Sequence, residues 1–467
     1  MANQVDYRDP TPNNFPQDYD PAKVDPRVKL RSDSIKRKQK GVDTREAMYQ
    51  ALEIGSVTAN EAKETAVDTA SRQDEVDQSQ KDFEDRYNKQ IAGNTNIDET
   101  IDLRRDSANN DFKTAKLRVD NIEKSVVYNT QVSMSSATND IKTALTEFKS
   151  TLNRNAIKIL LLQDLHFTKR TDMTDGYQLA GPLALEHLGL AEQLTDSIDG
   201  VVINGDNVHG IENKDITIKR NEQVVNNVKA VFGTLPVQIT LGNHDDNSVF
   251  LKSQVLSLVE LESIYGGKTY SYQDYAESKL RVILLSGFEN PETGGSTNYY
   301  RDSYSIFAQE QLNWLANDAL KVPAGYQVLI FNHSPFLGFF NNKPYSYMTN
   351  VNHDVLMSIL MAFQNGLKTT ANGTNVDYPV SIDVDFSAQG AGTIIACIFG
   401  HEHRDVADIQ MLNNIRGIQR GANIAVGAGR TIGTVSEHLV DVVEVDTMNK
   451  HIKLNRFGAG NSLEFDY

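Results

Sequence analysis

Residues 157–166 read IKILLLQDLH, and this stretch decides the fold class. Its first six residues are almost continuously apolar, which is typical of a strand buried on both faces. Similar short apolar runs return at 201–203, 237–241, 282–285, 328–331 and 394–399, and helix-compatible segments separate them. Further apolar runs at 423–426, 439–445 and 452–454 predict that the chain ends in antiparallel or mixed strands. We therefore predict one large α/β domain over residues 156–467.

Five of these runs end in polar turns of similar chemistry. The turns contain, in chain order, Asp164 with His166, then Asp206, then Asn243 with His244 and Asp245, then His333, and finally His401 with His403. Ligand sites of open α/β sheets form at the carboxyl ends of the strands. Asp-x-His by itself is more often a turn or cap than a ligand pair, and Gly-Asp after a strand is usually a turn. Gly-Asn-His-Asp is less common, and Gly-His-x-His is a fair metal signal. Five such turns in this order rarely arise by chance, so we predict a functional site.

The ordered set of turns resembles the calcineurin-like metallophosphoesterase superfamily over roughly residues 157–467. The resemblance implies a two-sheet sandwich flanked by helices (α/β/β/α), with two metals at the strand ends. It implies the following roles: Asp164, His166 and His403 hold the first metal, Asp206 bridges both, and Asn243, His333 and His401 hold the second. It also places His244 beside the scissile phosphate as a histidine that is not a ligand.

The residue types suit hydrolysis of a phosphate ester. Two divalent cations about 3.5–4 Å apart lower the pKa of a bridging water and clamp an in-line displacement. Imidazole, carboxylate and amide oxygen favour Mn, Fe or Zn. The single cysteine, Cys397, excludes a Cys-based zinc cluster and an intrachain disulfide. The leaving oxygen needs a proton, so we expect His244 to be catalytic, with Asp245 as its orienting partner.

Two features depart from, or add to, the family pattern. The family motif that begins with Gly205-Asp206 often continues to another carboxylate, whereas here the run is Asn207-Val208-His209-Gly210. His209 either supports a ligand or lies at the surface, and we favour the supporting role. Two insertions, 291–305 and 336–353, suit a sugar or polyol surface, and local packing is an equally good interpretation. Their notable side chains are Tyr299, Tyr300, Arg301, Tyr304, Phe339, Phe340, Tyr345 and Tyr347.

The first third of the chain has a different composition. Residues 1–42 are rich in Pro, Asp and Asn and then basic, which predicts an extended arm, either a solvated tail or a docking arm. Residues 43–155 contain no proline and open with Asp43 and Glu46, a pattern like a capping box. Their apolar stripe is thin and needs partner chains. We predict an elongated, self-associating helical stalk, a trimeric coiled coil, with an unpartnered polar helix as the alternative.

The stalk resembles the N-terminal region of tail or baseplate proteins from phages of low-GC Gram-positive bacteria. This resemblance implies a virion protein that is made in the host cytoplasm without a signal peptide and acts at the extracellular host surface beside other tail proteins. The abundant phosphodiester polymer there is teichoic acid. We expect a phosphodiesterase that cleaves this glycerol- or ribitol-phosphate polymer. The alternatives are a nucleotide or nucleic-acid phosphodiesterase, and a non-catalytic structural or receptor-binding baseplate protein.

Charge and hydrophobicity exclude some other classes. The chain of 467 residues has 46 Lys and Arg against 62 Asp and Glu, a formal net charge of -16. This charge argues against a protein built to bind nucleic-acid phosphates. Because no run of 18 apolar residues occurs, we expect no membrane span. The opening MANQVDYRDPTPNNF lacks the apolar segment of a secretory signal.

Overall fold

The computed structural model describes residues 24–37, isolated positions between 48 and 81, and residues 137–170, 172–290, 299–340 and 348–467. The chain divides into two units, Met1–Asn121 and Ile122–Tyr467, which we describe separately. The predicted stalk falls largely outside the described residues, although the isolated positions between 48 and 81 are helical. The stalk and its self-association therefore stay predictions.

The first unit contains helix α1, Pro26–Arg37. Residues 1–42 were predicted to form an extended arm, and residues 26–37 of it are helical; the arm itself stays a prediction. Proline at the first helical position is favourable because its missing N–H would have no partner there. The backbone N–H of Arg27 donates to Asp25 Oδ1 at 2.8 Å, which caps the helix, and Lys29 pairs with Asp33 one turn later at 3.1 Å.

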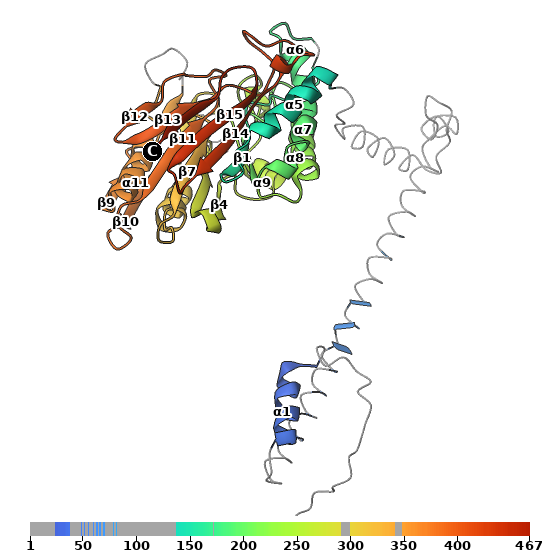
Figure 1. Cartoon of the computed structure of the whole chain (residues 1–467), viewed down its shortest axis with the longest axis vertical. Helices are drawn as coiled ribbons and strands as arrows, with labels where there is room; N and C mark the ends of the chain where they lie inside the picture. Colours follow the sequence, from blue (N-terminus) through green and yellow to red (C-terminus); the bar gives the residue numbers. More distant parts are fainter. Residues whose placement is uncertain are drawn as a thin grey trace, which may run out of the picture. The chain divides into compact units, whose positions relative to one another are not determined.

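The second unit is a sandwich of two six-stranded sheets (Figure 1). The first sheet has the order β16-β15-β14-β1-β2-β3, and the second has the order β12-β13-β11-β7-β5-β4. Two further pairs, β9 with β10 and β6 with β8, lie outside these sheets. The strands are β1 Ile157–Leu162, β2 Gly200–Asn204, β3 Val237–Thr240, β4 Ser271–Tyr275, β5 Leu280–Leu284, β6 Tyr304–Ile306, β7 Gln327–Asn332, β8 Thr349–Val351, β9 Lys368–Asn372, β10 Ser381–Asp385, β11 Thr393–Phe399, β12 Gln410–Leu412, β13 Ile415–Gln419, β14 Leu439–Asp446, β15 His451–Gly458 and β16 Leu463–Asp466.

Helices cover the outer faces of both sheets (Figure 1). The α-helices of this unit are α5 Asn139–Thr151, α6 Tyr177–Ala180, α7 Ala184–Glu192, α8 Lys214–Phe232, α9 Leu258–Tyr265, α10 Gln309–Trp314 and α11 His353–Asn365. Short helical turns of other types are η3 Gly181–Leu183, η4 Thr195–Ser197, η5 Lys252–Gln254, η6 Ala276–Ser278, η7 Leu315–Ala319 and η8 Val435–Glu437. Among the described helices, none has the length and hydrophobicity needed to span a bilayer.

Strand β1 shows why these apolar runs form buried strands. Successive side chains of a strand point to opposite faces. Leu160 and Leu162 accordingly join the core beneath α5, α7 and α8, whereas Ile159 and Leu161 join the core between the two sheets. Strand β1 is parallel to β2 and antiparallel to β14, and β2 is parallel to β3. The predicted α/β/β/α arrangement of layers therefore matches the observed one.

Helix α5 packs on the α/β unit, although the sequence analysis assigned its residues to the stalk. Thr138 caps it by accepting from the backbone N–H of Ile141 at 3.4 Å. Ile141, Leu145 and Phe148 recur at helical spacing and are buried in the same core as β1 and β2. The ring of Phe148 lies 5.6 Å from that of Phe457 on β15. The apolar face of this helix is thus covered within the chain.

One predicted strand is absent. Residues 423–426 form no strand, because their backbone groups bond to the turn after β1. The N–H of Asn423 donates to the carbonyl oxygen of Gln163 at 2.9 Å, and that of Ile424 donates to Asp164 at 3.1 Å. The segment instead supports the turn that carries Asp164.

Candidate metal centre

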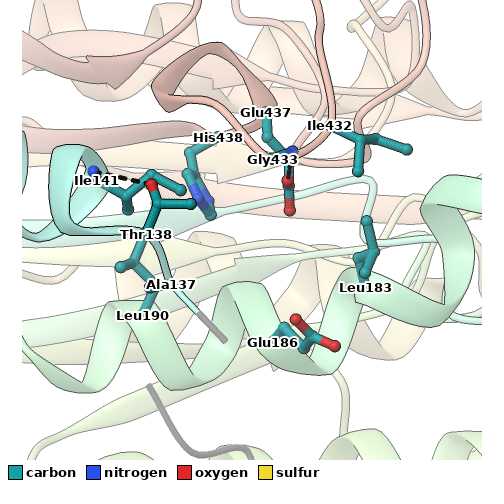
Figure 2. A pocket seen from close by; sticks show the side chains of 10 residues that line it. All are labelled: Ala137, Thr138, Ile141, Leu183, Glu186, Leu190, Ile432, Gly433, Glu437 and His438. Carbon is teal, nitrogen blue, oxygen red and sulfur yellow. Dashed lines mark hydrogen bonds between the residues drawn. The ribbon is translucent and has the colours of Figure 1, made fainter. Parts of the chain in front are cut away.

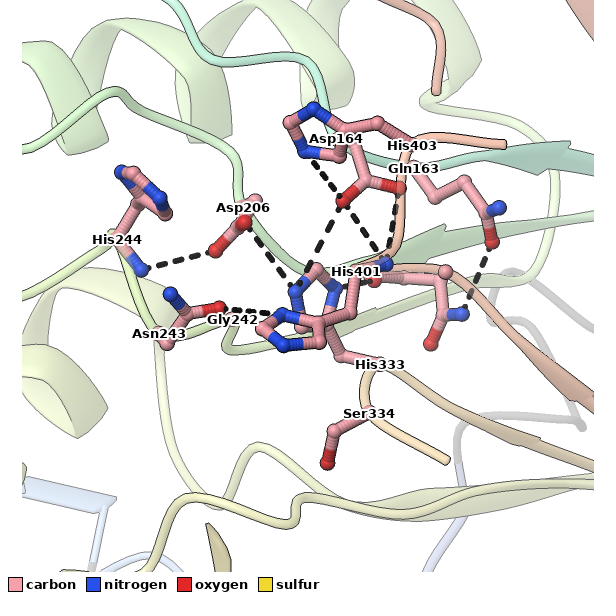
Figure 3. A network of polar contacts seen from close by, with 12 residues as sticks. Gln163, Asp164, Asp206, Gly242, Asn243, His244, His333, Ser334, His401 and His403 are labelled. Carbon is pink, nitrogen blue, oxygen red and sulfur yellow. Dashed lines mark hydrogen bonds and ion pairs between the residues drawn. The ribbon is translucent and has the colours of Figure 1, made fainter. Parts of the chain in front are cut away.

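The turns that follow five strands meet at one edge of the sandwich. Asp164 and His166 follow β1, Asp206 follows β2 and Asn243 follows β3 in the first sheet. His333 follows β7, and His401 and His403 follow β11 in the second sheet. Figure 3 shows six of these side chains close together, namely Asp164, Asp206, Asn243, His333, His401 and His403, and His166 Nε2 lies 3.3 Å from Asp206 Oδ2. All seven predicted ligands therefore lie in one place, and their assignment as ligands is our proposal.

The first group of ligand atoms comes from Asp164, His166, Asp206 and His403, within 4.8 Å of one another. His166 Nε2 lies 3.3 Å from Asp206 Oδ2 and 2.8 Å from His403 Nε2. His403 Nε2 lies 3.3 Å from Asp164 Oδ1. Ligand atoms about 2.0–2.2 Å from one ion are separated by distances of about this size.

The second group comes from Asp206, His333 and His401, again within 4.8 Å. His333 Nε2 lies 3.2 Å from Asp206 Oδ2. Asn243 joins this group because its Oδ1 atom lies 2.8 Å from Nδ1 of His401. Asp206 belongs to both groups, which is the arrangement needed for a carboxylate that bridges two ions.

The backbone at these turns is in an unusual conformation. Five of the seven proposed ligands have positive φ angles: Asp164 52°, His166 47°, Asp206 50°, His401 70° and His403 51°. Residues other than glycine rarely adopt this region, at a cost of order 1–3 kcal/mol each in the most unfavourable cases. Such strain concentrates at sites where function demands a particular geometry. Here it turns side chains from two sheets toward one point.

Buried ligand atoms without good hydrogen bonds indicate that the site fits a pair of divalent cations. Asp206 Oδ2 and His333 Nε2 are buried and face each other at 3.2 Å, and neither makes a well-directed hydrogen bond among the described residues. Although burial opposes it, the negative charge of Asp206 raises the pKa of His333 to about 9. Burial tends to raise the pKa of Asp206, but the charges of His333, His244 and His166 hold this pKa well below the usual range. Without metal, protons take the place that cations would occupy.

Hydrogen bonds behind the ligands fix their directions. His333 Nδ1 donates to the carbonyl oxygen of Asn204 at 2.7 Å, which turns Nε2 toward Asp206. The backbone N–H of His401 donates to Asp164 Oδ1 at 3.0 Å, and that of His244 donates to Asp206 Oδ1 at 2.9 Å. Ring direction and carboxylate rotation are therefore set by the backbone, before any ion binds.

His244 lies at the border of the centre, with its ring 4.5 Å from that of His166. Its Nδ1 donates to the carbonyl oxygen of His209 at 2.9 Å, which leaves Nε2 to exchange a proton with a leaving group. Asp245 does not perform the orienting role expected for it. Its carboxylate instead accepts from Gly242 at 2.8 Å, Val208 at 3.0 Å and the Asn207 side chain at 3.0 Å, which ties two ligand-bearing turns together.

His209 is buried behind the centre and is not a surface histidine. Its Nδ1 lies 3.2 Å from Nδ1 of His166. Burial, together with the charge of His244, lowers the pKa of His209 to about 3, so the ring is neutral and able to accept a hydrogen bond. Tyr177 stacks on it at 4.3 Å, and the Tyr177 hydroxyl lies 3.1 Å from Nδ1 of His403. Sequence reasoning missed Tyr177, because nothing local marks it as a neighbour of His403.

The two insertions contribute less to the site than expected. Arg301 is buried and donates to Asp246 at 2.8 Å, so it anchors its loop. Phe339 and Phe340 pack in the core beneath the second sheet. Tyr345 and Tyr347 lie outside the described residues. Phe250, which sequence reasoning missed, is 42% exposed and lies 5.0 Å from the ring of His209 and 5.7 Å from that of His244.

Residues 157–405 match the family of calcineurin-like phosphoesterases. No curated protein matches the chain. Among solved structures, a dimetal phosphatase from Danio rerio is 14% identical at a TM-score of 0.45, with 67% of this chain and 99% of that one covered. A purple acid phosphatase from yellow lupin seeds is 13% identical at a TM-score of 0.38, with 68% and 55% covered. A predicted phosphoesterase from Streptococcus pneumoniae is 10% identical at 0.26, with 68% and 100% covered.

The matched residues span more than half of the chain and include all seven proposed ligands. The centre that these residues form has two overlapping groups of ligand atoms, as a pair of divalent ions requires. When bound, such ions neutralise phosphoryl charge and activate a water. The chain belongs to the calcineurin-like phosphoesterase family and is a metal-dependent phosphoric ester hydrolase with a dinuclear divalent metal centre.

Proposed function

We propose that this hydrolase is a phosphodiesterase of a phage tail and that it cleaves teichoic acid at the host surface. The observation that supports an alkyl phosphate ester as substrate is the position of His244. Its Nδ1–H is fixed on the carbonyl oxygen of His209 at 2.9 Å, so a second proton on the ring sits on Nε2 beside the centre. An alkoxide is a poor leaving group and needs that proton. Diesters of glycerol or ribitol have such leaving groups.

The exposed ring of Phe250 supports a polyol substrate. The ring of Phe250 lies 5.0 Å from that of His209 and 5.7 Å from that of His244, next to the place proposed for the leaving group. Aromatic faces bind the C–H groups of sugars and polyols while leaving their hydroxyls in water. The net charge of -16 repels an anionic polymer. Binding of such a substrate therefore depends on attraction by the metal centre.

The phage-tail part of the proposal rests on the sequence of residues 43–155. The predicted stalk would display several catalytic units on one assembly, as a tail protein requires. Light scattering on the full chain is the direct test, with three copies expected. A monomer at micromolar concentration would remove the support for a tail assembly and leave the catalytic assignment untouched.

Hydrolysis of defined substrates tests the activity itself. The substrates are bis-p-nitrophenyl phosphate, purified wall teichoic acid, a cyclic nucleotide and DNA, each with and without Mn. We expect cleavage of the first two substrates. The rate of hydrolysis should fall by about 10³-fold or more in Asp206→Ala, because electrostatic stabilisation of the transition state is lost. The exposed control Asp466→Ala should keep full activity.

The other outcomes separate the alternatives. Cleavage of the cyclic nucleotide or DNA, with none of teichoic acid, would identify a nucleotide or nucleic-acid phosphodiesterase. Polymer binding without turnover would identify a binding protein of the baseplate. Phe250→Ala refines the assignment: KM for the polymer should rise several-fold more than KM for the small ester, whereas the remote exposed control Val259→Ala should change neither.

A further inference from the structure

A second group of metal-binding side chains occurs in the same unit and shares no residue with the catalytic centre. His187 lies on α7, Glu437 ends η8, and His438 directly precedes β14. All three are buried, at 1%, 7% and 5% exposure. Their ligand atoms lie within 4.8 Å of one another, as in the catalytic centre.

The spacing within this group suits one cation. His187 Nε2 lies 3.0 Å from Glu437 Oε1. In a tetrahedral site with bonds of about 2.0–2.1 Å, neighbouring ligand atoms are about 3.3 Å apart. The corresponding pairs of the catalytic centre lie at 3.2 Å and 3.3 Å. The distance between His187 and Glu437 is therefore close to the corresponding distances in the catalytic centre.

His438 supplies an independent observation. Within the part of the chain that the structure describes, neither of its ring nitrogens has a hydrogen-bond partner, and Nδ1 of His187 also lacks one. Buried polar groups are almost always satisfied, and one left without a partner costs about 1–3 kcal/mol. The ring is held in place by edge contact with His187 at 4.9 Å and by Phe457 at 5.8 Å. A buried imidazole that is held in place and has no hydrogen-bond partner can coordinate an ion without first losing another contact.

A cavity of about 180 Å³ lies beside the group. Figure 2 shows Glu437 and His438 in its wall, with Thr138, Ile141 of α5 and Leu190 of α7 nearby. The cavity has room for water next to the group. It also lies where α5, α7 and the segment before β14 meet.

We propose that His187, Glu437 and His438 bind a third divalent transition-metal ion, with zinc as the best-suited ion. Two imidazoles and one carboxylate form a ligand set that zinc accepts. The ion ties α7 to the segment before β14 at the place where α5 joins the α/β unit. Its role is structural, so it does not depend on the substrate proposed above.

Metal stoichiometry tests this assignment with zinc alone as the probe. The metal-free full-length protein is titrated with zinc, and bound metal is measured by mass spectrometry after removal of free ions. We expect three equivalents in the wild-type protein and two in His438→Gln and Glu437→Gln. These variants should keep the hydrolysis of bis-p-nitrophenyl phosphate. The matched control His451→Gln, a histidine at the exposed end of β15, should keep three equivalents.

Cobalt gives a second readout, since visible absorption bands distinguish the coordination of Co²⁺ at each site. One set of bands should be missing in His438→Gln. If circular dichroism shows that the variants do not fold, the number of zinc equivalents bound by the wild-type protein decides whether the third site exists. Two equivalents in the wild-type protein, or equal stoichiometry in wild type and folded variants, would overturn the proposal and leave water as the occupant of the cavity.

Discussion

The ring of His209 lies directly behind that of His166, with their Nδ1 atoms 3.2 Å apart. Because Nε2 of His166 faces Asp206 and His403, the proton of a metal-binding His166 belongs on Nδ1, and neutral His209 accepts it. In the turn after Asp206, this chain therefore places an imidazole that orients a proposed ligand.

Removal of this acceptor should weaken the first metal site. We expect His209→Ala to lower metal affinity by about 10–100-fold, as is usual when the partner of a metal-binding histidine is lost. His209→Gln, which retains an accepting oxygen, should recover much of the loss. Competition with a chelator measures both. Unchanged affinity in a folded His209→Ala protein would show that the contact is only packing.

Metal uptake should release protons. In the metal-free protein the carboxylate of Asp206 raises the pKa of His333 to about 9, although burial opposes this. At pH 7 the ring is charged and must lose its proton before Nε2 can bind an ion. Apparent affinity should therefore rise by about tenfold per pH unit up to about pH 9 for each proton displaced. Calorimetry in buffers of different ionisation enthalpy counts these protons, and a count of zero at pH 7 would contradict the assignment.

Gly242 allows the turn after β3 to approach the bridging carboxylate. A Cβ atom there would lie 2.1 Å from Asp206 Oδ1 and 2.2 Å from the backbone nitrogen of Asp206. We expect Gly242→Ala to displace Asp206, abolish binding of the second ion and lower the free energy of unfolding by about 1–3 kcal/mol. Gly55→Ala, whose Cβ would meet nothing within 4 Å, is the control. Normal metal content in Gly242→Ala would mean that the turn relaxes freely.

Asp441 connects the two sheets through buried charges. It accepts from Arg420 at 2.8 Å and from Arg456 at 2.7 Å, and all three are nearly inaccessible. Asp441→Asn leaves two buried guanidinium groups without full compensation, so we expect a loss of about 3–5 kcal/mol at pH 7. The exposed Asp466→Asn should change stability little. Denaturant unfolding measures both variants, and a loss below about 1 kcal/mol in Asp441→Asn would show that the arginines find other partners.

The same carboxylate predicts the direction of an acid effect. Burial opposes ionisation, but Arg456 and Arg420 hold the pKa of Asp441 well below its usual range. Its contribution is therefore complete above the unfolded-state pKa near ~3.9 and is lost as pH falls through the lower folded-state value. The stability difference between wild type and Asp441→Asn should stay constant from about pH 5 to 7 and shrink below about pH 4.

The backbone pattern and the identity of the proposed ligands could be predicted because both are local properties of the chain. The apolar run 157–162 forms β1 with the predicted bounds, and its alternating side chains enter two cores. The polar turns follow such strands directly, so parallel strands bring them to one edge. The predicted strand at 423–426 failed because its hydrogen bonds go to the turn after β1, a partner that no local signal reveals.

By itself, the sequence determined which polar residues follow which strands. These residues are Asp164, His166, Asp206, Asn243, His333, His401 and His403, with His244 next to Asn243. Only the tertiary structure decided what stands behind these residues. It placed Tyr177 against His403, assigned Asp245 to the turns instead of His244, and buried Arg301 as an anchor. Asp245 meets Val208 in the neighbouring turn of the same sheet, and the other two contacts join residues 226 and 55 positions apart, so all three need the folded chain. Local periodicity specifies which face a side chain occupies, whereas packing of the sheets specifies which side chain it meets.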